Sequence, residues 1–422
     1  MSQFLSSQFL RRIYKSNGDP IDITDHNEED VDLEDHFVVE KDPMRINYPS
    51  DARVLMSIPP RIDGQPPDPD GHAECILYGM AKSKIVNHPE YPKAVPKPVG
   101  SRPYDVKQTR DMGLGLFAAR DILPGELVIA ERPLLLVPIL LTKKNPFSSP
   151  DAPTELAHRW LTQAFARHEM ELELAVRRMS SMAREAFLSL YISDHRPTGS
   201  DLSGIIETNA IRRLQFFGDL NPGHMAALPG ATEPAPDQDH NYLGVFNFIS
   251  RMNHSCSPNV IPKFDTPSLS LQFFAPEKIK SGEQIFRHYS DLSQPYNIRQ
   301  AALSQRFGIW CSCPACTNAT PASDKLRITH EQRFQDYFRD WHSSRTSRQP
   351  SVSQAEGMRH LNPMLRLRQQ LAEEGLTATP TYGMLCALIA TVYEKMGMKK
   401  TADKYMEIFE GYAGYFEGLS DL

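Results

Sequence analysis

A group of three cysteines is the clearest chemical signal in the 422 residues. Cys311, Cys313 and Cys316 follow one another with the spacing C-x-C-x₂-C. Thiolates at such spacing are typical zinc ligands, and a structural zinc site takes four. One ligand must therefore come from elsewhere, and Cys256 is a candidate because it lies in a polar cluster. Three reduced cysteines without metal are the alternative, which is less favoured because neighbouring thiols oxidise readily.

The polar cluster that contains Cys256 occupies residues 253–259, with the letters NHSCSPN. Asn253, His254 and Asn259 carry polar groups that are costly to bury unless they are hydrogen-bonded. A polar loop with a helix-capping serine is the simple interpretation. A site in which a polar ligand satisfies these groups is the functional one.

A glycine pair at Gly113 and Gly115 opens the segment GLGLFA, residues 113–118. The spacing matches G-x-G-x-x-A, but a dinucleotide fingerprint must follow a strand and begin a helix. Pro124-Gly125 and an apolar, β-like run follow instead, so a Rossmann site is disfavoured. Two interpretations remain, an ordinary glycine turn and a backbone that approaches a ligand closely.

A tyrosine, Tyr289, ends the run GEQIFRHY, residues 282–289. A single tyrosine after a strand is most often a half-buried packing residue. Taken alone, its position favours packing over catalysis.

Strands and helices that must position these residues can be read from hydrophobic periodicity. Residues 114–117 and 127–137 predict a hairpin around the turn at 121–125, and residues 154–191 predict two helices. A Gly-, Pro- and Asp-rich loop is expected over 225–240. Further strands are expected at residues 243–248, 269–274 and 284–289.

The two ends of the chain differ in character. Residues 325–422 predict a helical region, with an α-hairpin formed by 385–396 and 401–415 around Gly397, similar to helical (TPR-like) repeats. Residues 1–100 are acidic and Pro-rich, which predicts a largely disordered, linker-like segment with one small element near Cys75–Met80.

The acidic run carries more than the whole net charge. Residues 19–42 contain eleven acidic residues and one lysine, a charge of −10, so the rest of this −6 chain carries +4. Such a run can attract basic substrates or shield the body from DNA. A solvated, disordered tail is the interpretation we favour.

Composition excludes several classes of protein. Six cysteines are too few for a disulfide scaffold, and no run of about 18 apolar residues predicts a membrane span. The charge is not that of a general nucleic-acid binder. No secretory signal is evident, so an intracellular protein of the nucleus or cytoplasm is expected.

Together and in this order, the four features resemble a SET domain, the fold of protein lysine methyltransferases. The resemblance covers about residues 104–317 and includes the post-SET cysteines. It implies an α+β fold of small β-sheets with a pseudoknot-like active site. The implied parts are a SET domain at 104–300 with a helical insert at 140–208, a post-SET zinc segment at 301–320, and the helical C-terminal region.

The order of segments is most similar to the SET–MYND branch and its fungal relatives, with one departure. A MYND finger needs seven cysteines and a histidine, yet residues 138–208 contain no cysteine. The partner-binding role of that finger is therefore not carried over to this chain. The predicted helices occupy the insert instead.

The resemblance implies a role for each motif residue. S-adenosylmethionine (AdoMet) is expected against Met112, Gly113, Leu114 and Gly115. The other residues expected to contact it are Asn209, Asn253, His254, Tyr289 and Ile309. Tyr289 matches the active-site tyrosine. The matching zinc ligands are Cys256, Cys311, Cys313 and Cys316.

Two positions depart from the family pattern near the active site. Phe307 stands where relatives often carry tyrosine, and the missing hydroxyl is expected to permit higher methylation states. Ile309 stands where relatives often place an aromatic residue near the adenine, which is expected to weaken cofactor stacking.

The predicted function is AdoMet-dependent methylation of a lysine in a protein, a histone or another substrate. One alternative is a catalytically weak SET module that serves as an interaction scaffold, with a protein partner at the helical C-terminal region. Another is a zinc-stabilised helical binding protein without a cofactor site. Neither direct nucleic-acid binding nor membrane binding is expected.

Overall fold

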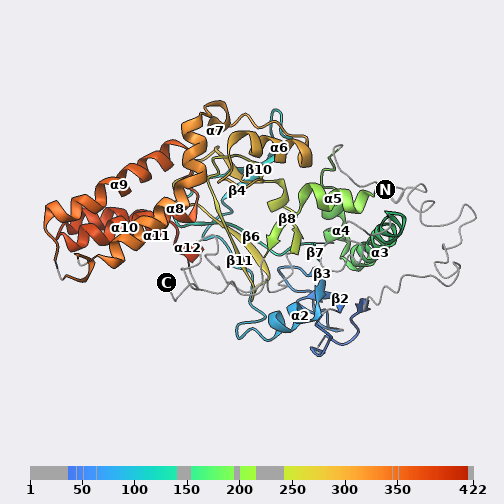
Figure 1. The fold of residues 1–422 in the computed structure, drawn as a ribbon. Coiled ribbons are helices and arrows are strands. Elements are labelled where there is room, and N and C mark those ends of the chain that lie inside the picture. Colours follow the sequence, from blue (N-terminus) through green and yellow to red (C-terminus); the bar gives the residue numbers. More distant parts are fainter. Residues whose placement is uncertain are drawn as a thin grey trace, which may run out of the picture.

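The computed structural model describes residues 37–139, 154–193, 200–214 and 242–416, apart from positions 44, 51, 63, 345 and 350. Most of the acidic run and the loop expected over 225–240 lie outside these residues. The architecture is α+β, with three small sheets in the centre and helices on two sides (Figure 1).

The largest sheet has six strands and begins in the N-terminal segment. Its order is β1 (Phe37–Val39), β2 (Arg53–Ile58), β3 (Ala73–Tyr78), β7 (Leu135–Pro138), β9 (Tyr242–Val245) and β8 (Ile211–Leu214). Every residue of β2 is buried, and α2 (Gly79–Val86) follows β3 directly. The linker expected up to residue 100 is therefore wrong for residues 37–86, although the small element near Cys75 is confirmed.

Buried charge ties this N-terminal segment to the rest of the molecule. The Glu74 carboxylate in β3 is fully buried. It accepts hydrogen bonds from Ser57 at 3.0 Å, from Arg61 at 2.6 Å and from Arg178, at the end of the long helix α3 (Thr154–Arg178), at 3.1 Å. Such an arrangement holds the strands in one position against the helix, because an unpaired carboxylate would be costly there.

Two smaller sheets complete the central part. The first has four strands in the order β10 (Asn253–His254), β13 (Gln284–Arg287), β5 (Leu114–Ala118) and β4 (Tyr104–Gln108). The second has three, in the order β11 (Ile261–Asp265), β12 (Ser270–Phe274) and β6 (Leu127–Glu131). The expected hairpin of 114–117 with 127–137 is wrong, because β5 pairs with β4 and β13 whereas β6 pairs with β12.

Helices α3 (Thr154–Arg178), α4 (Ser181–Leu188) and α5 (Asp201–Asn209) cover one face of the large sheet, as the green elements of Figure 1 show. Their apolar side chains, such as Leu172, Phe187 and Ile205, form a core with Leu55 and Leu135 of the strands. The two helices expected over 154–191 are thus confirmed as α3 and α4.

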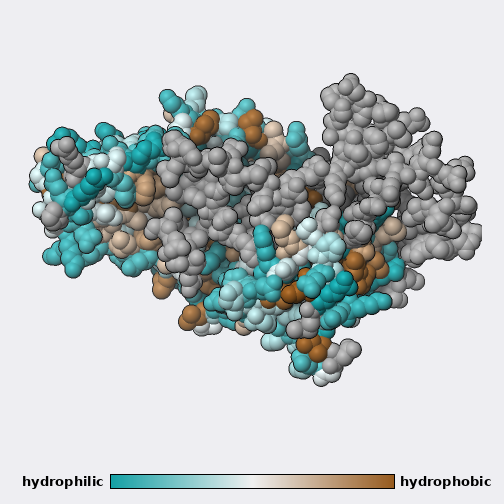
Figure 2. Space-filling view, turned by 60° about the horizontal axis from the view of Figure 1, so that its bottom comes forward, coloured by the Kyte–Doolittle hydropathy of each residue, from teal (hydrophilic) through white to brown (hydrophobic). Residues whose placement is uncertain are grey.

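The C-terminal helices form a second unit, coloured orange to red in Figure 1. It contains α8 (Pro321–Ser343), η2 (Thr346–Arg348), α9 (Gln354–Glu373), α10 (Pro380–Lys395), α11 (Lys399–Glu410) and α12 (Ala413–Phe416). The expected α-hairpin is present as α10 and α11, and Gly397 adopts a φ of +74° between them. On the face seen in Figure 2, this unit is mainly hydrophilic, because its apolar side chains form an internal core.

Candidate active site and metal centre

A short hairpin between β4 and β5 carries the glycine pair. The Thr109 hydroxyl accepts the Met112 N–H at 2.8 Å and donates to the Gly113 carbonyl at 2.8 Å, which closes the turn. Gly113 adopts a φ of +67°, and no atom lies within 4 Å of the position that a Cβ would occupy. The Met112 and Leu114 side chains are exposed. The backbone here is therefore open to a ligand, as one of the two interpretations requires.

The second glycine brings this hairpin against the polar cluster. A Cβ on Gly115 would lie 2.8 Å from Asn253 Nδ2 and 2.6 Å from Gln284 Nε2. Asn253 Nδ2 also donates to the Leu114 carbonyl at 3.1 Å. Only glycine leaves room for this contact, so the spacing of the pair serves both ligand access and packing.

The polar cluster is held mainly by the protein's own main chain. Strand β10 pairs in parallel with β13, which places Asn253 opposite Phe286 and His254 opposite Arg287. Asn259 donates to the Gln284 carbonyl at 2.9 Å and accepts the Phe286 N–H at 2.8 Å. The Asn259 amide is thus satisfied without a ligand, and the loop is rigid at the edge of the open glycine turn.

His254 lies between the candidate metal centre and Tyr289. Its Nδ1 accepts the Tyr289 N–H at 2.9 Å, so a neutral ring carries its proton on Nε2. That Nε2 lies 3.3 Å from Cys256 Sγ and can donate to it. One imidazole therefore links a sulfur to the backbone of the candidate catalytic tyrosine.

Tyr289 lies in an aromatic group with His254 and Phe307. The centroid of the Tyr289 ring lies 5.3 Å from that of His254 and 5.0 Å from that of Phe307, and both rings are tilted relative to Tyr289. The Tyr289 hydroxyl donates to the Met252 carbonyl at 2.8 Å. Burial raises the pKa of Tyr289, although Arg287 and Arg306 oppose this, so the phenol is neutral near pH 7. Its oxygen lone pairs can accept a further hydrogen bond.

Asn209 lies at the end of α5, and its side chain is already engaged. Nδ2 donates to the carbonyls of Tyr191 at 2.7 Å and Ile205 at 2.9 Å. Its backbone carbonyl accepts a hydrogen bond at 3.1 Å from the hydroxyl of Ser250, a residue that lies just before β10. The fold therefore brings Asn209 beside the segment that leads to Asn253, but its amide nitrogen is bonded to the main chain.

Phe307 and Ile309 lie at the junction of the SET-like body and the C-terminal helices. Phe307 ends α6 (Tyr296–Phe307), and its carbonyl accepts the Ser193 hydroxyl at 3.3 Å. Ile309 is half-buried against the core of the C-terminal unit. Gly308 between them adopts a φ of +66°, which turns the chain toward the cysteines.

The four predicted metal ligands come together. The sulfur atoms of Cys256, Cys311, Cys313 and Cys316 all lie within 4.8 Å of one another, and those of Cys256 and Cys316 are 3.5 Å apart. Four sulfurs around one zinc at about 2.3 Å would be about 3.8 Å apart, so the geometry fits. Hydrogen bonding with Cys256 lowers the pKa of Cys313 to about 5, which favours a thiolate.

Hydrogen bonds to the backbone hold the three clustered cysteines in place. Cys313 precedes the short helix α7 (Pro314–Thr317), and its carbonyl accepts the Cys316 N–H at 2.8 Å. Gln300 of α6 bonds both the N–H and the carbonyl of Cys311, at 3.0 Å and 2.7 Å. The remaining thiols, Cys75 and Cys386, are buried elsewhere, and burial raises the pKa of Cys386 to about 12.

Glu131 holds the turn before β10, a role that the sequence analysis did not identify. Its carboxylate accepts the N–H groups of Asn247, Phe248 and Ile249 at 2.8–3.1 Å. Burial raises the pKa of Glu131 to about 7 despite these bonds. An acidic residue at the end of an apolar strand was the available signal.

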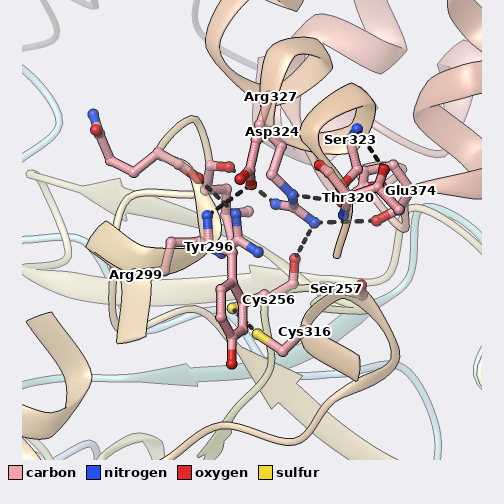
Figure 3. Close-up of polar contacts among 12 residues, drawn as sticks. Cys256, Ser257, Tyr296, Arg299, Cys316, Thr320, Ser323, Asp324, Arg327 and Glu374 are labelled. Atoms are coloured by element: carbon pink, nitrogen blue, oxygen red, sulfur yellow. Dashed lines mark hydrogen bonds and ion pairs between the residues drawn. The ribbon is translucent and has the colours of Figure 1, made fainter. Parts of the chain in front are cut away.

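Arg327 joins the C-terminal unit to the site, and no sequence motif predicts this role. Its guanidinium is fully buried and donates to the carbonyls of Cys256 and Leu292 at 3.3 Å and 2.9 Å. It pairs with the Glu374 carboxylate at 2.7 Å and donates to the Glu374 carbonyl at 3.1 Å (Figure 3). Nothing in the local sequence distinguishes Arg327 from other helix arginines.

Comparison with known proteins identifies the central part. Residues 113–290 match the SET domain family. The chain is 34% identical to human N-lysine methyltransferase SMYD2 over 94 residues, which cover 22% of this chain and 21% of that protein. It is 38% identical to Schizosaccharomyces pombe histone-lysine N-methyltransferase set5 over 79 residues, covering 19% and 25%. The chain thus spans about a quarter or less of the curated relatives it matches.

Solved structures similar to this chain match it with low identity and low TM-score. The SET domain of LSMT bound to lysine and AdoHcy has 13% identity and a TM-score of 0.25, with 76% of this chain and 89% of that chain covered. No helix in the described ranges has the length and apolar character needed to cross a membrane. The sequence matches therefore identify residues 113–290 as similar to the SET domain, and parts of the chain as similar to N-lysine methyltransferase SMYD2 and to the Schizosaccharomyces pombe SET domain and MYND-type zinc finger protein 6.

Proposed function

We propose that this protein is an AdoMet-dependent protein-lysine N-methyltransferase. The observation that carries the proposal is the convergence of the open glycine hairpin, Asn253-His254 and Tyr289 around one region of the SET domain. Relatives that match by sequence are named N-lysine and histone-lysine methyltransferases. The substrate is a protein lysine, in a histone or in another protein.

The donor would be held against the glycine hairpin. Met112, Gly113 and Leu114 supply an open backbone edge. Asn253 packs against Gly115 and bonds the Leu114 carbonyl at one end of this edge. When bound, AdoMet supplies a methyl group on a positively charged sulfonium. His254 in β10, and Asn209, which bonds Ser250 just before β10, belong to the segments that border the glycine hairpin.

The acceptor lysine would reach Tyr289 between aromatic rings. Methyl transfer needs a neutral amine aligned with the methyl group, and a free lysine has a pKa of about 10.4. The Tyr289 hydroxyl already donates to Met252, so its oxygen can accept an amine N–H and orient the nitrogen lone pair. Phe307 provides the second ring and no hydrogen bond.

The four cysteines would hold one structural Zn²⁺. Four thiolates fill a tetrahedral site and leave no position for a reacting ligand. Cys256 belongs to the segment that carries His254, whereas the other three belong to the chain after α6. Metal binding would thus fix the position of Phe307 relative to His254 and Tyr289, between whose rings the lysine would lie.

The decisive variant is Tyr289→Phe, which removes one hydroxyl. We expect about 100-fold slower methyl transfer to a protein substrate, as for loss of one positioning hydrogen bond at a reacting centre. AdoMet affinity by calorimetry and the circular dichroism spectrum should be unchanged. Tyr337→Phe on α8, outside the site, is the matched control. Wild-type rates for Tyr289→Phe would contradict the proposal.

The scaffold alternative makes a different prediction for the unmodified protein. A weak or inactive SET module would show no heat on titration with AdoMet although its zinc content is full. The half-buried Ile309 and the missing hydroxyl at Phe307 motivate this alternative. A radiolabelled methyl-transfer screen over histones and cell lysate separates the two.

A further inference from the structure

Arg299 of α6 is a buried cation that the proposed reaction does not use. Its side chain is 1% exposed, and Nη1 donates to the Gln294 carbonyl at 2.6 Å. Within the part of the chain that the structure describes, Nε and Nη2 have no hydrogen-bond partner, and no carboxylate pairs with the guanidinium. A buried cation in this state is costly unless an opposite charge lies nearby.

The groups that supply this charge are the sulfur atoms. Arg299 extends from α6 to the same region as Cys256 and Cys316 in Figure 3. The Arg299 guanidinium interacts with the sulfurs of Cys256 and Cys316, both by hydrogen bonding and by charge. These sulfurs are therefore the neighbours of its remaining N–H groups.

The charge of a loaded metal site explains why a cation is needed here. A divalent ion with four thiolates has a net charge of −2, and the sulfurs of Cys256, Cys311 and Cys316 are buried among apolar side chains such as Ile261 and Leu303. His254 Nε2 offers one neutral donor to Cys256. A guanidinium supplies both further donors and a full positive charge.

Helix α6 as a whole is built around the cysteines. Gln300, the residue after Arg299, is 2% exposed and clamps both backbone polar groups of Cys311. Adjacent residues of one helix thus serve the backbone of one ligand and the sulfurs of two others. Such an outer layer orients metal ligands and tunes their basicity.

We propose that Arg299 is the outer-sphere counter-ion of the four-cysteine metal site and a positioning residue for Cys256 and Cys316. The inference rests on the metal site of the proposed function and is independent of methyl transfer. It assigns to Arg299 a role in the retention of zinc.

The test measures metal binding on the full chain. Zinc-loaded wild type, Arg299→Met and Arg299→Lys are mixed with excess chelator, and release is followed with a chromogenic zinc indicator. We expect zinc affinity to fall about 10–100-fold in Arg299→Met, with correspondingly faster release, as is usual for loss of an outer-sphere partner. Arg299→Lys should be intermediate, because it keeps the charge but not the planar fork.

The control and a spectroscopic readout make the outcome unambiguous. Arg333→Met removes a surface arginine of α8 that bonds Gln370 at 3.1 Å and should release zinc like wild type. Co²⁺ substitution reports sulfur coordination by its charge-transfer absorption, including in Arg299→Lys if Arg299→Met does not fold. Release within twofold of wild type and an unchanged Co²⁺ spectrum in either variant would overturn the inference. Wild type that takes up neither metal would overturn it as well, whether or not methyl transfer is observed.

Discussion

Replacement of Arg327 tests whether the C-terminal helices and the SET domain form one energetic unit. Arg327→Met keeps the length of the side chain and avoids a large cavity. It removes the ion pair with Glu374 and the donors to the carbonyls of Cys256, Leu292 and Glu374. The Arg327 side chain is 0% exposed and that of Glu374 is 13% exposed, so water cannot replace all these contacts.

The magnitude follows from these contacts. Removing one partner of a buried ion pair costs about 3–5 kcal/mol. Each buried carbonyl left without a donor adds up to about 1–3 kcal/mol. We therefore expect Arg327→Met to lower the free energy of unfolding by at least about 3 kcal/mol, and Glu374→Gln to lower it less, because an amide oxygen still accepts.

The assay is urea unfolding followed by circular dichroism and by tryptophan fluorescence. Trp341 on α8 is 2% exposed and reports the C-terminal unit. Arg333→Met, at the surface of the same helix, should change stability by less than about 0.5 kcal/mol. A loss below about 1 kcal/mol for Arg327→Met would refute the reasoning, because it would mean that solvent or neighbouring groups satisfy the orphaned carbonyls.

Three further variants probe the site. Gly115→Ala places a methyl group 2.8 Å from Asn253 Nδ2 and 2.6 Å from Gln284 Nε2, so we expect at least about tenfold weaker AdoMet binding by calorimetry, and unchanged affinity would argue against the donor position. Burial raises the pKa of Glu131 from 4.5 to about 7, so its contribution to stability is present below about pH 4.5 and is lost as the pH rises to about 7. Glu131→Gln should remove this part of the pH dependence. The measurement is the difference in the free energy of unfolding between pH 5 and pH 7.5, and an equal difference in both proteins would contradict the prediction. Phe307→Tyr adds a hydroxyl beside Tyr289 and should shift products toward monomethyl-lysine in mass spectrometry, whereas an unchanged distribution would exclude Phe307 as the determinant.

The hydrophobic pattern predicted elements better than it predicted their pairing. The two helices over 154–191 and the C-terminal α-hairpin are present because helical periodicity is a local property. The expected hairpin of 114–117 with 127–137 fails because β5 pairs with the preceding β4 and with the distant β13, whereas β6 pairs with the distant β12. Pro-rich composition likewise hid β2 and β3, and β7, the parallel neighbour of β3, lies about sixty residues later.

The candidate site divides in the same way. Sequence alone determined the chemical inventory, because the cysteine spacing, the glycine pair and the Asn-His cluster are short motifs whose chemistry is local. Tertiary structure decided what surrounds them: the approach of Cys256 to the later cysteines, the glycine contact with Asn253, and the two buried arginines, Arg299 and Arg327. These depend on which buried surfaces pack together, and burial is what gives an otherwise ordinary arginine its energetic weight.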